Sequence, residues 1–274
     1  MIRILLVHVD DGDGHLDDRL AAARLLARRF DALVVGLHVM PLPLLPVGYG
    51  EAAAYVGPEI LEAQREAARE RARRLEARFR EALADLVPEI RFEVLEGEPR
   101  LLVPERARVA DLVLVAQTPA HGLDALEPDV AEHLAMEGVV PALVMPAGGG
   151  RGEVGHRVLV GWNGSRQAAR ALHAARPFLA TAREVRLVTL GEDAGAAGLE
   201  DAALWLRRHG IEPVVERRPA ADRPGARLLE LAREAGADLL VIGAYGHSRL
   251  RELVLGGATR HILQHADLPV LVSG

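Results

Sequence analysis

The chain contains three apolar anchor segments twice, in the same order. They read RILLV, ADLVLV and VPALV in the first copy and RVLV, ADLLVI and LPVLV in the second. The anchors begin at Arg3, Ala110 and Val140 and again at Arg157, Ala237 and Leu268. Such self-similarity indicates a duplicated structural unit. We therefore expect two domains, residues 1–147 and 157–274, with a glycine-rich, flexible linker over 148–156.

The first copy is predicted to carry an insertion. Its first and last anchors lie farther apart than the corresponding anchors of the second copy. The segment from Pro41 to about Gln64 contains the proline- and glycine-rich run PLPLLPVGYG, which is typical of a loop. The extra residues are therefore assigned to that segment.

The anchors alternate with amphipathic segments such as Arg65–Leu86 and Arg227–Ala235. Strands that are apolar at nearly every position are buried on both faces, as in a parallel sheet covered by helices. The sequence predicts two tandem α/β domains, each a doubly wound parallel-sheet sandwich. Ligands bind such sheets beyond the carboxyl ends of the strands, where the strand order reverses.

Composition excludes several classes of function. The 274 residues carry a net charge of −6, which argues against nucleic-acid and acidic-membrane partners. No apolar run approaches the length of a membrane span, and no signal peptide is recognisable, so we expect a cytoplasmic protein. The absence of cysteine and lysine excludes thiolate metal sites, thiol nucleophiles, Schiff bases and Walker-A loops. An anion must then be bound by arginine, histidine or backbone N–H groups.

The second copy carries two glycine clusters after its strand Asp238–Ile242. The first is GAYG over 243–246, and the second, GGATR over 256–260, opens a helix that runs to about His265. Unpaired N–H groups and the helix dipole at such a helix start favour phosphate oxygens. Ordinary strand-to-helix turns also favour glycine, so this pattern alone leaves both interpretations open.

The segment GAYGHSRLRELVLGGATRHILQHADLPVLV resembles the carboxyl-terminal signature of ATP-binding universal stress proteins, G-x2-G-x9-G-(S/T). Gly243, Gly246 and Gly256 match the motif, whereas Gly257 stands where the family has Ser or Thr. That change loses a hydroxyl but keeps the backbone N–H, and Thr259 is a candidate replacement donor. The resemblance covers 157–272 strongly and 1–146 loosely. It implies the fold of the adenine nucleotide α-hydrolases.

The resemblance also implies a nucleotide site at the start of the second copy. Asn163 replaces the family's aspartate, which faces the adenine and ribose. Leu190, at the end of the strand Val185–Leu190, would pack against the adenine, although ordinary core packing explains it equally well. The complete expected site is Gly161, Trp162, Asn163, Leu190, Ile242, Gly243, Tyr245, Gly246, Gly256, Gly257, Ala258, Thr259 and Arg260.

The first copy keeps Asp10 but lacks both glycine clusters. By the resemblance it is a degenerate copy whose loop no longer holds a triphosphate, and the alternative is an altered site for a different ligand. In the family, the last strands of two domains pair edge to edge. Here 142–145 and 270–273 are predicted to pair within one chain as a pseudo-dimer, and two chains would then be able to form a homodimer.

Other residue patterns are assigned structural roles. The spaced histidines His261 and His265 lack the glutamate of a metalloprotease motif and are interpreted as a surface pair. The acidic run Asp10–Asp18 lacks the order of a calcium loop and is assigned to helix capping. Ser165 does not lie in a nucleophile elbow. The charged helix Arg65–Arg80 is interpreted as a solvated face with ion pairs.

The sequence as a whole indicates a universal stress protein that binds ATP, or ADP or AMP, in its second domain as a regulatory ligand, with Mg²⁺ at most accompanying the nucleotide. We expect no catalytic residues and no protein-bound metal. Two alternatives remain. One is a slow ATPase or another adenine-nucleotide hydrolase, for which the loop offers only His247 and Glu252. The other is a ligand-free interaction module, with Gly257 and Asn163 marking a lost site.

Overall fold

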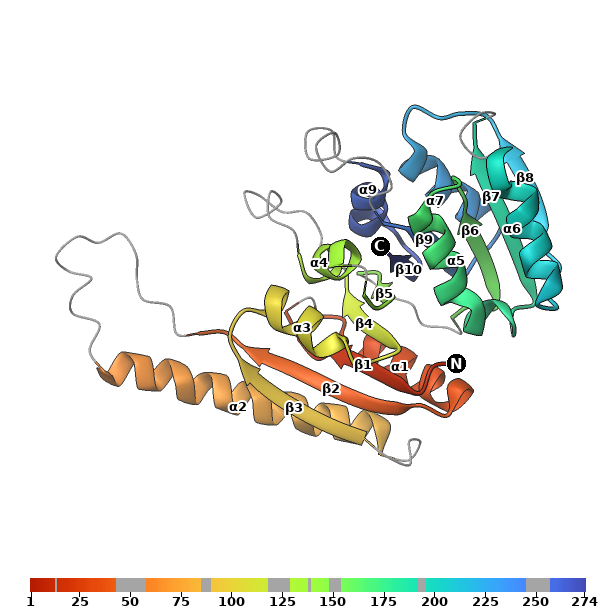
Figure 1. Cartoon of the computed structure of the whole chain (residues 1–274). Coiled ribbons are helices and arrows are strands. Elements are labelled where there is room, and N and C mark those ends of the chain that lie inside the picture. The colour runs from red at the N-terminus through yellow and green to blue at the C-terminus, as the bar shows by residue number, and fades with distance from the viewer. Residues whose placement is uncertain are drawn as a thin grey trace.

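The computed structural model describes residues 1–12, 14–42, 58–84, 90–117, 129–137, 139–147, 154–191, 196–244 and 257–274. Helices cover both faces of a single 10-stranded sheet (Figure 1). No helix among these residues is long and apolar enough to cross a membrane. Most of the predicted insertion, over 43–57, and the linker over 148–153 lie outside the described residues.

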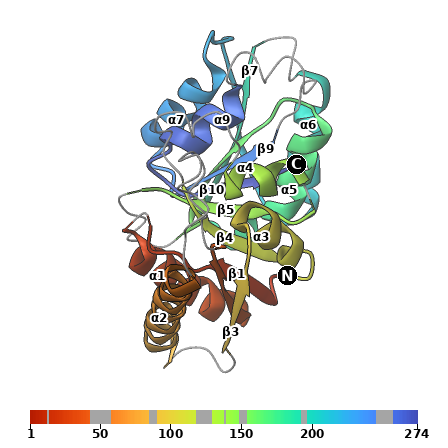
Figure 2. The same cartoon turned by 90° about the vertical axis from the view of Figure 1, so that its left-hand side faces the viewer.

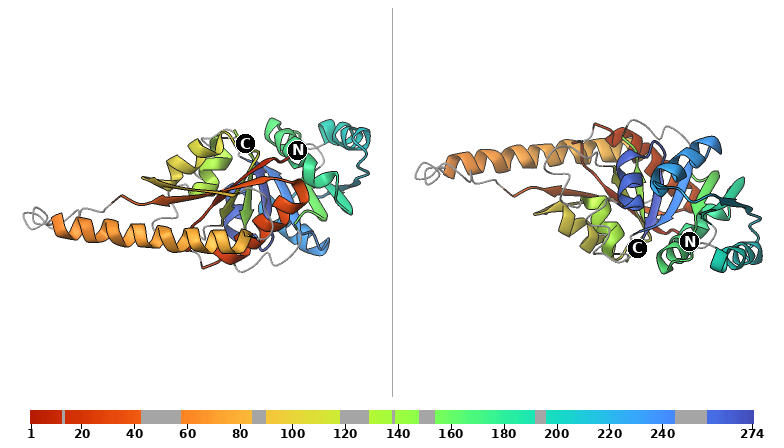
Figure 3. Two further views of the ribbon diagram at one scale, coloured as in Figure 1. Left: turned by 90° about the horizontal axis from the view of Figure 1, so that it is seen from below. Right: turned by 90° about the horizontal axis from the view of Figure 1, so that it is seen from above.

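The first half of the chain contains five strands and four helices in these ranges. Its elements are β1 (Ile4–His8), α1 (Leu16–Phe30), β2 (Leu33–Met40), α2 (Pro58–Leu83), β3 (Ile90–Glu96), α3 (Pro99–Ala107), β4 (Leu112–Ala116), α4 (Val130–Glu137) and β5 (Ala142–Met145). Helix α2 begins inside the predicted insertion and ends before Leu86. Figure 3 shows its amino-terminal turns reaching beyond the sheet.

The second half repeats the same alternation. Its elements are β6 (Arg157–Gly161), α5 (Arg166–Leu179), β7 (Glu184–Leu190), α6 (Ala196–Arg208), β8 (Val214–Arg218), α7 (Pro224–Glu234), β9 (Leu239–Gly243), α9 (Ala258–His265) and β10 (Val270–Ser273). The predicted helices over 227–235 and 256–265 are therefore present, with boundaries that differ by at most three residues.

The strand order is β3-β2-β1-β4-β5-β10-β9-β6-β7-β8. Each half is a parallel, doubly wound sheet with the same internal order, which confirms the predicted fold class. The halves join where β5 pairs antiparallel with β10, and Leu143 stands opposite Leu271. This confirms the predicted edge-to-edge pairing within one chain. Figure 2 shows the junction between the lower and upper halves of the molecule.

The sheet separates two hydrophobic cores, each of which runs through both halves. One contains residues of α1, α2, α5 and α6, and the other residues of α3, α4, α7 and α9. Alternate residues of a strand belong to opposite cores because side chains in a strand alternate between faces. On β1, Leu5 and Val7 enter the first core, whereas Leu6 enters the second.

Strand pairing corrects the sequence alignment of the two copies by one residue. The sequence matched Arg3 with Arg157, but Leu5 pairs with Leu112 as Val158 pairs with Leu239. The structural counterpart of Val158 is therefore Leu5. A shift of one residue would exchange the two faces of the strand, so burial selects this register.

The acidic run Asp10–Asp18 was expected to cap α1, and Asp17 and Asp18 do lie in its first turn, but no described side chain of the run makes the capping hydrogen bond. The residue that precedes α1 is His15, and it makes no side-chain capping hydrogen bond. Asp10 Oδ1 instead accepts hydrogen bonds from the backbone N–H of Gly12 at 3.0 Å and from Arg71 Nη2, on α2, at 2.9 Å.

Helix α2 has the predicted exposed ion pairs along its surface, such as Arg73 with Glu66 at 2.7 Å.

Candidate functional site

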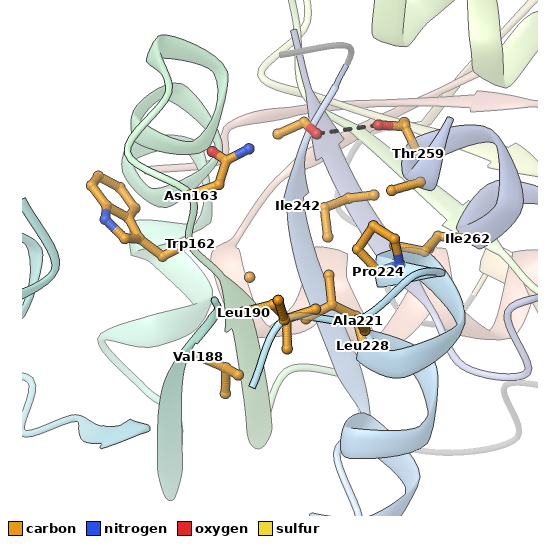
Figure 4. Close-up of a pocket in the computed structure, with 14 residues that line it drawn as sticks. Trp162, Asn163, Val188, Leu190, Ala221, Pro224, Leu228, Ile242, Thr259 and Ile262 are labelled. Carbon is orange, nitrogen blue, oxygen red and sulfur yellow. Dashed lines mark hydrogen bonds between the residues drawn. The ribbon is translucent and has the colours of Figure 1, made fainter. Parts of the chain in front are cut away.

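A cavity of about 300 Å³ lies at the carboxyl ends of β6, β7 and β9 (Figure 4). The chain adds β7 and β8 on one side of β6 and then crosses to β9 on the other side. The cavity therefore lies at the point where the strand order reverses, which is where a doubly wound sheet binds its ligands. Its lining is Gly161, Trp162, Asn163, Val188, Leu190, Ala220, Ala221, Pro224, Leu228, Ile242, Gly243, Ala258, Thr259 and Ile262.

Aliphatic side chains form most of the wall. Val188 and Leu190 are alternate residues of β7 and project to the same face of the sheet. Leu228 from α7 and Ile262 from α9 face them across the cavity, as Figure 4 shows. A flat apolar ring system is the kind of group that such a wall would bury favourably.

Gly161 keeps the cavity open at the end of β6. A Cβ atom added to it would lie 3.3 Å from Leu228 Cδ1 and 3.6 Å from Ile242 Cγ2, so a larger side chain would enter the cavity. The neighbouring Trp162 lines the cavity, but Figure 4 shows its ring turned away from it. The ring packs against the core on the opposite face of the sheet.

The loop after β6 is held by two side-chain hydrogen bonds. Asn163 Oδ1 accepts the N–H of Ser165 at 3.1 Å, and Ser165 Oγ accepts the N–H of Ala168 at 3.1 Å as the N-cap of α5. Ser165 therefore has a structural role. The amide nitrogen of Asn163 remains available as a donor at the rim of the cavity.

Helix α9 directs its amino terminus at the same cavity. Its N-cap is Gly257, and no side chain among the described residues caps the first turn. Ala258 and Thr259 both line the cavity, and Thr259 Oγ1 lies 3.5 Å from the carbonyl oxygen of Gly243. The first N–H groups of a helix lack intrahelical acceptors and carry the positive end of the helix dipole, so this turn favours an anion.

Gly243 has a packing role that the sequence did not reveal. A Cβ atom at Gly243 would lie 2.4 Å from Ala168 N, which is far inside van der Waals contact. The first turn of α5 therefore needs glycine at this position. Gly225 of α7 has a similar role, because its Cβ would lie 2.6 Å from the carbonyl oxygen of Ala258.

A sequence model of the universal stress protein family matches residues 170–273. A universal stress protein of Methanocaldococcus jannaschii is 31% identical over 49 residues, which are 18% of this chain and 30% of that protein. Another, from Synechocystis sp., is 29% identical over 120 residues, 42% of this chain and 41% of that protein. Residues 170–273 of the chain thus match the universal stress protein family. The matches span less than half the length of these two curated relatives.

The fold of the family extends over both halves. The crystal structure of a universal stress protein from Archaeoglobus fulgidus has a TM-score of 0.73 to this chain at 19% identity, covering 98% of this chain and 95% of that chain. At this level of identity the similarity shows the shared fold. The family sequence signal lies mainly in the second half, which also contains the cavity.

The structure brings most of the expected site residues together. Eight of them line the cavity, namely Gly161, Trp162, Asn163, Leu190, Ile242, Gly243, Ala258 and Thr259. Tyr245, Gly246 and Gly256 lie outside the described residues, as do His247 and Glu252. Gly257 is the N-cap of α9.

The side chain of Arg260 does not line the cavity. Its Nε lies 3.1 Å from Oε1 of Glu132, which is in the first half and only 5% exposed. Burial raises the pKa of Glu132, the neighbouring Asp129 raises it further, and Arg260 partly offsets both. Arg260 therefore acts in this structure as a contact between the halves.

Sequence reasoning missed six lining residues, namely Val188, Ala220, Ala221, Pro224, Leu228 and Ile262. Val188 could have been predicted from the sequence, because it lies two positions before Leu190 on the same strand face. Ile262 could have been predicted in the same way, because it lies four residues after Ala258 on the same face of α9. No sequence pattern marks the lining residues over 220–228, because their position at the cavity depends on how α7 packs against the sheet.

The two histidines of α9 form the expected surface pair. Their rings stack with centroids 4.3 Å apart, and His265 Nδ1 lies 2.9 Å from the carbonyl oxygen of His261. Burial lowers the pKa of His261, and the charges of His265 and Arg223 lower it further. The described residues contain no group of three or more side chains suited to a metal ion.

Proposed function

We propose that the second half of this universal stress protein binds ATP or a related adenine nucleotide, and that the nucleotide acts as a regulatory ligand. The observation that carries the proposal is an apolar cavity at the reversal point of the sheet that ends at the amino terminus of α9, whose first turn no described side chain caps. A nucleotide combines the two groups that these surfaces favour, a flat base and an anion.

In the proposed arrangement the base lies between Leu190 and Leu228, and the phosphates lie toward Ala258. Asn163 is positioned at the rim for a hydrogen bond to the ribose or the base edge. The N–H groups of the first turn of α9 meet the phosphate charge, and Arg260 takes no part, because its guanidinium is paired with Glu132.

The described residues around the cavity supply affinity but no catalytic set. Asn163 and Thr259 are its polar lining side chains, and neither is a general base or a strong metal ligand. Backbone N–H groups of this kind stabilise ground state and transition state alike. We therefore expect binding without rapid turnover, and Mg²⁺ that enters with the nucleotide.

The first experiment is mass spectrometry of the purified, denatured protein for a co-purified nucleotide, followed by calorimetric titration with ATP, ADP, AMP and GTP. We expect about one adenine nucleotide per chain and weaker binding of GTP. Absence of binding by all four nucleotides would overturn the proposal and favour the ligand-free interaction module.

Turnover is tested separately by single-turnover hydrolysis of bound ATP over hours. The matched control is Gly161→His, which fills the base cavity and exposes any contaminating ATPase. Hydrolysis faster than about one turnover per minute that disappears in the control would establish an enzyme instead.

A further inference from the structure

The two halves meet around a local twofold axis. Leu143 of β5 stands opposite Leu271 of β10, and each is the fourth residue of the repeated anchor VPALV or LPVLV. Antiparallel strands that pair through equivalent residues are related by a twofold axis. Equivalent residues on the elements flanking this axis are therefore brought toward one another.

Glu132 and Arg260 are such an equivalent pair. Helices α4 and α9 have eight residues each, contact each other, and precede β5 and β10 at the same spacing. Figure 2 shows them side by side at the junction. Glu132 is the third residue of α4 and Arg260 is the third residue of α9, and the Nε to Oε1 distance between them is 3.1 Å. The same position thus carries opposite charges in the two halves.

A second equivalent pair lies on the opposite face of the sheet. The buried residues of α1 and α5 repeat with the same spacing, which makes Arg29 the counterpart of Thr181. Arg29 Nε donates to Thr181 Oγ1 at 3.0 Å, and Arg29 Nη1 donates to the carbonyl oxygen of Val154 at 2.6 Å. Here too the contact requires two different residues at equivalent positions.

We propose that Glu132 and Arg260 make the junction selective for unlike halves, so that it accepts one first half and one second half. If two second halves met in this way, Arg260 would face Arg260, and two first halves would bring Glu132 against Glu132. Like charges at a junction with one partner 5% exposed are strongly unfavourable. The pair therefore opposes like-with-like assembly of copies of this chain.

The pair specifies the partner more than it stabilises the fold. The pKa of Glu132 is raised even with Arg260 beside it, because burial and the charge of Asp129 together outweigh the ion pair and the hydrogen bonds. A neutral residue of the same shape at Glu132 should be tolerated, whereas a like charge should not.

The full-length chain allows a direct test, because single charge reversals recreate the excluded contacts. Glu132→Arg places two arginines together, as two second halves would, and Arg260→Glu places two glutamates together, as two first halves would. Thermal unfolding is compared for both, for the double reversal and for the neutral variant Glu132→Gln. Arg233→Glu, in the exposed pair with Asp267, is the matched surface control.

We expect Glu132→Gln and Arg233→Glu to melt within about 2 °C of wild type and each reversal at Glu132 or Arg260 to melt about 5–10 °C lower. The double reversal should recover most of that loss. The proposal is overturned if Glu132→Arg melts as high as Glu132→Gln, or if the double reversal melts no higher than the worse single reversal. The variants leave the cavity lining unchanged, so nucleotide titration reports on the proposed function separately.

Discussion

The two halves place equivalent strands at the cavity of the second half and at the corresponding position of the first half, but different side chains stand at the strand ends. Strand pairing makes His8 the counterpart of Gly161 and Ala116 the counterpart of Gly243. His8 is 6% exposed, so an imidazole is buried where the second half has the space beside Leu228. Equivalent strand ends thus carry a buried imidazole in the first half and a glycine beside a cavity in the second.

The loops after β1 and β6 differ in the same direction. Asn163 holds its loop through one backbone hydrogen bond, whereas its counterpart Asp10 is also bound by Arg71. Arg71 comes from α2, which has 26 residues, against 13 in α6. The longer helix carries a cation over the loop of the first half. The loop after β1 is therefore held by a charge contact that the loop after β6 lacks among the described residues.

The largest effect is expected from making the second half resemble the first at the cavity. Gly161→His places an imidazole beside Leu228 and Ile242, so we expect adenine nucleotide affinity to fall about 100-fold or more. Calorimetric titration measures the loss. The reciprocal variant His8→Gly is the control and should leave the affinity unchanged, and a tight-binding Gly161→His protein would contradict the assignment of the cavity.

The next effect concerns packing. Gly243→Ala introduces the residue that the first half has at Ala116, but its Cβ would lie 2.4 Å from Ala168 N. We expect the free energy of unfolding to fall by about 2–4 kcal/mol, because backbone must move. Chemical denaturation measures this. Ala116→Gly should cost about 1 kcal/mol or less, and equal costs at the two positions would show that α5 adjusts freely.

Removal of the cation at the junction should have a pH-dependent effect. Arg260→Gln leaves the buried Glu132 carboxyl, whose pKa is already raised by burial and by Asp129, without the charge that offsets them. A group with a raised pKa in the folded state loses stability as pH rises through that pKa. The loss of melting temperature relative to wild type should therefore be larger at pH 8 than at pH 4. A constant difference across that range would contradict this account.

The smallest effect is expected at the loop after β1, which Arg71 contacts. Burial raises the pKa of Asp11, but the hydrogen bond and charge of Arg71 outweigh it, so the net pKa is lowered. Such a group stabilises the fold above its unfolded pKa, about 3.9, and the stabilisation is lost as pH falls below that value. Because both side chains are 37% exposed, Arg71→Ala should cost at most about 1 kcal/mol at pH 7.

The Arg71→Ala cost should shrink toward zero on acidification. Arg69→Ala is the matched control, since Arg69 lies on the same helix and, among the described residues, pairs on its exposed surface with Glu62 and Glu66. Equal costs for the two variants in denaturant titration would mean that Arg71 does not fasten the loop.

Local residue patterns were sufficient to predict the fold. The repeated anchors predicted the duplication, and the apolar strands predicted parallel sheets. The pairing of β5 with β10 was expected from the resemblance to the universal stress proteins. The glycines and Leu190 predicted the edge of the sheet where the cavity lies. These features depend on periodicity and on strand ends, which a linear sequence displays directly.

Tertiary structure decided what depends on packing between distant segments. Leu228 became part of the cavity because α7 packs across it, and Gly243 is needed because its Cβ would lie 2.4 Å from the first turn of α5. Arg260, an expected site residue, is instead a partner of Glu132. Each outcome depends on which surfaces meet across the sheet and across the junction. A sequence lists the side chains, but only the packed chain determines which of them share a volume or a charge contact.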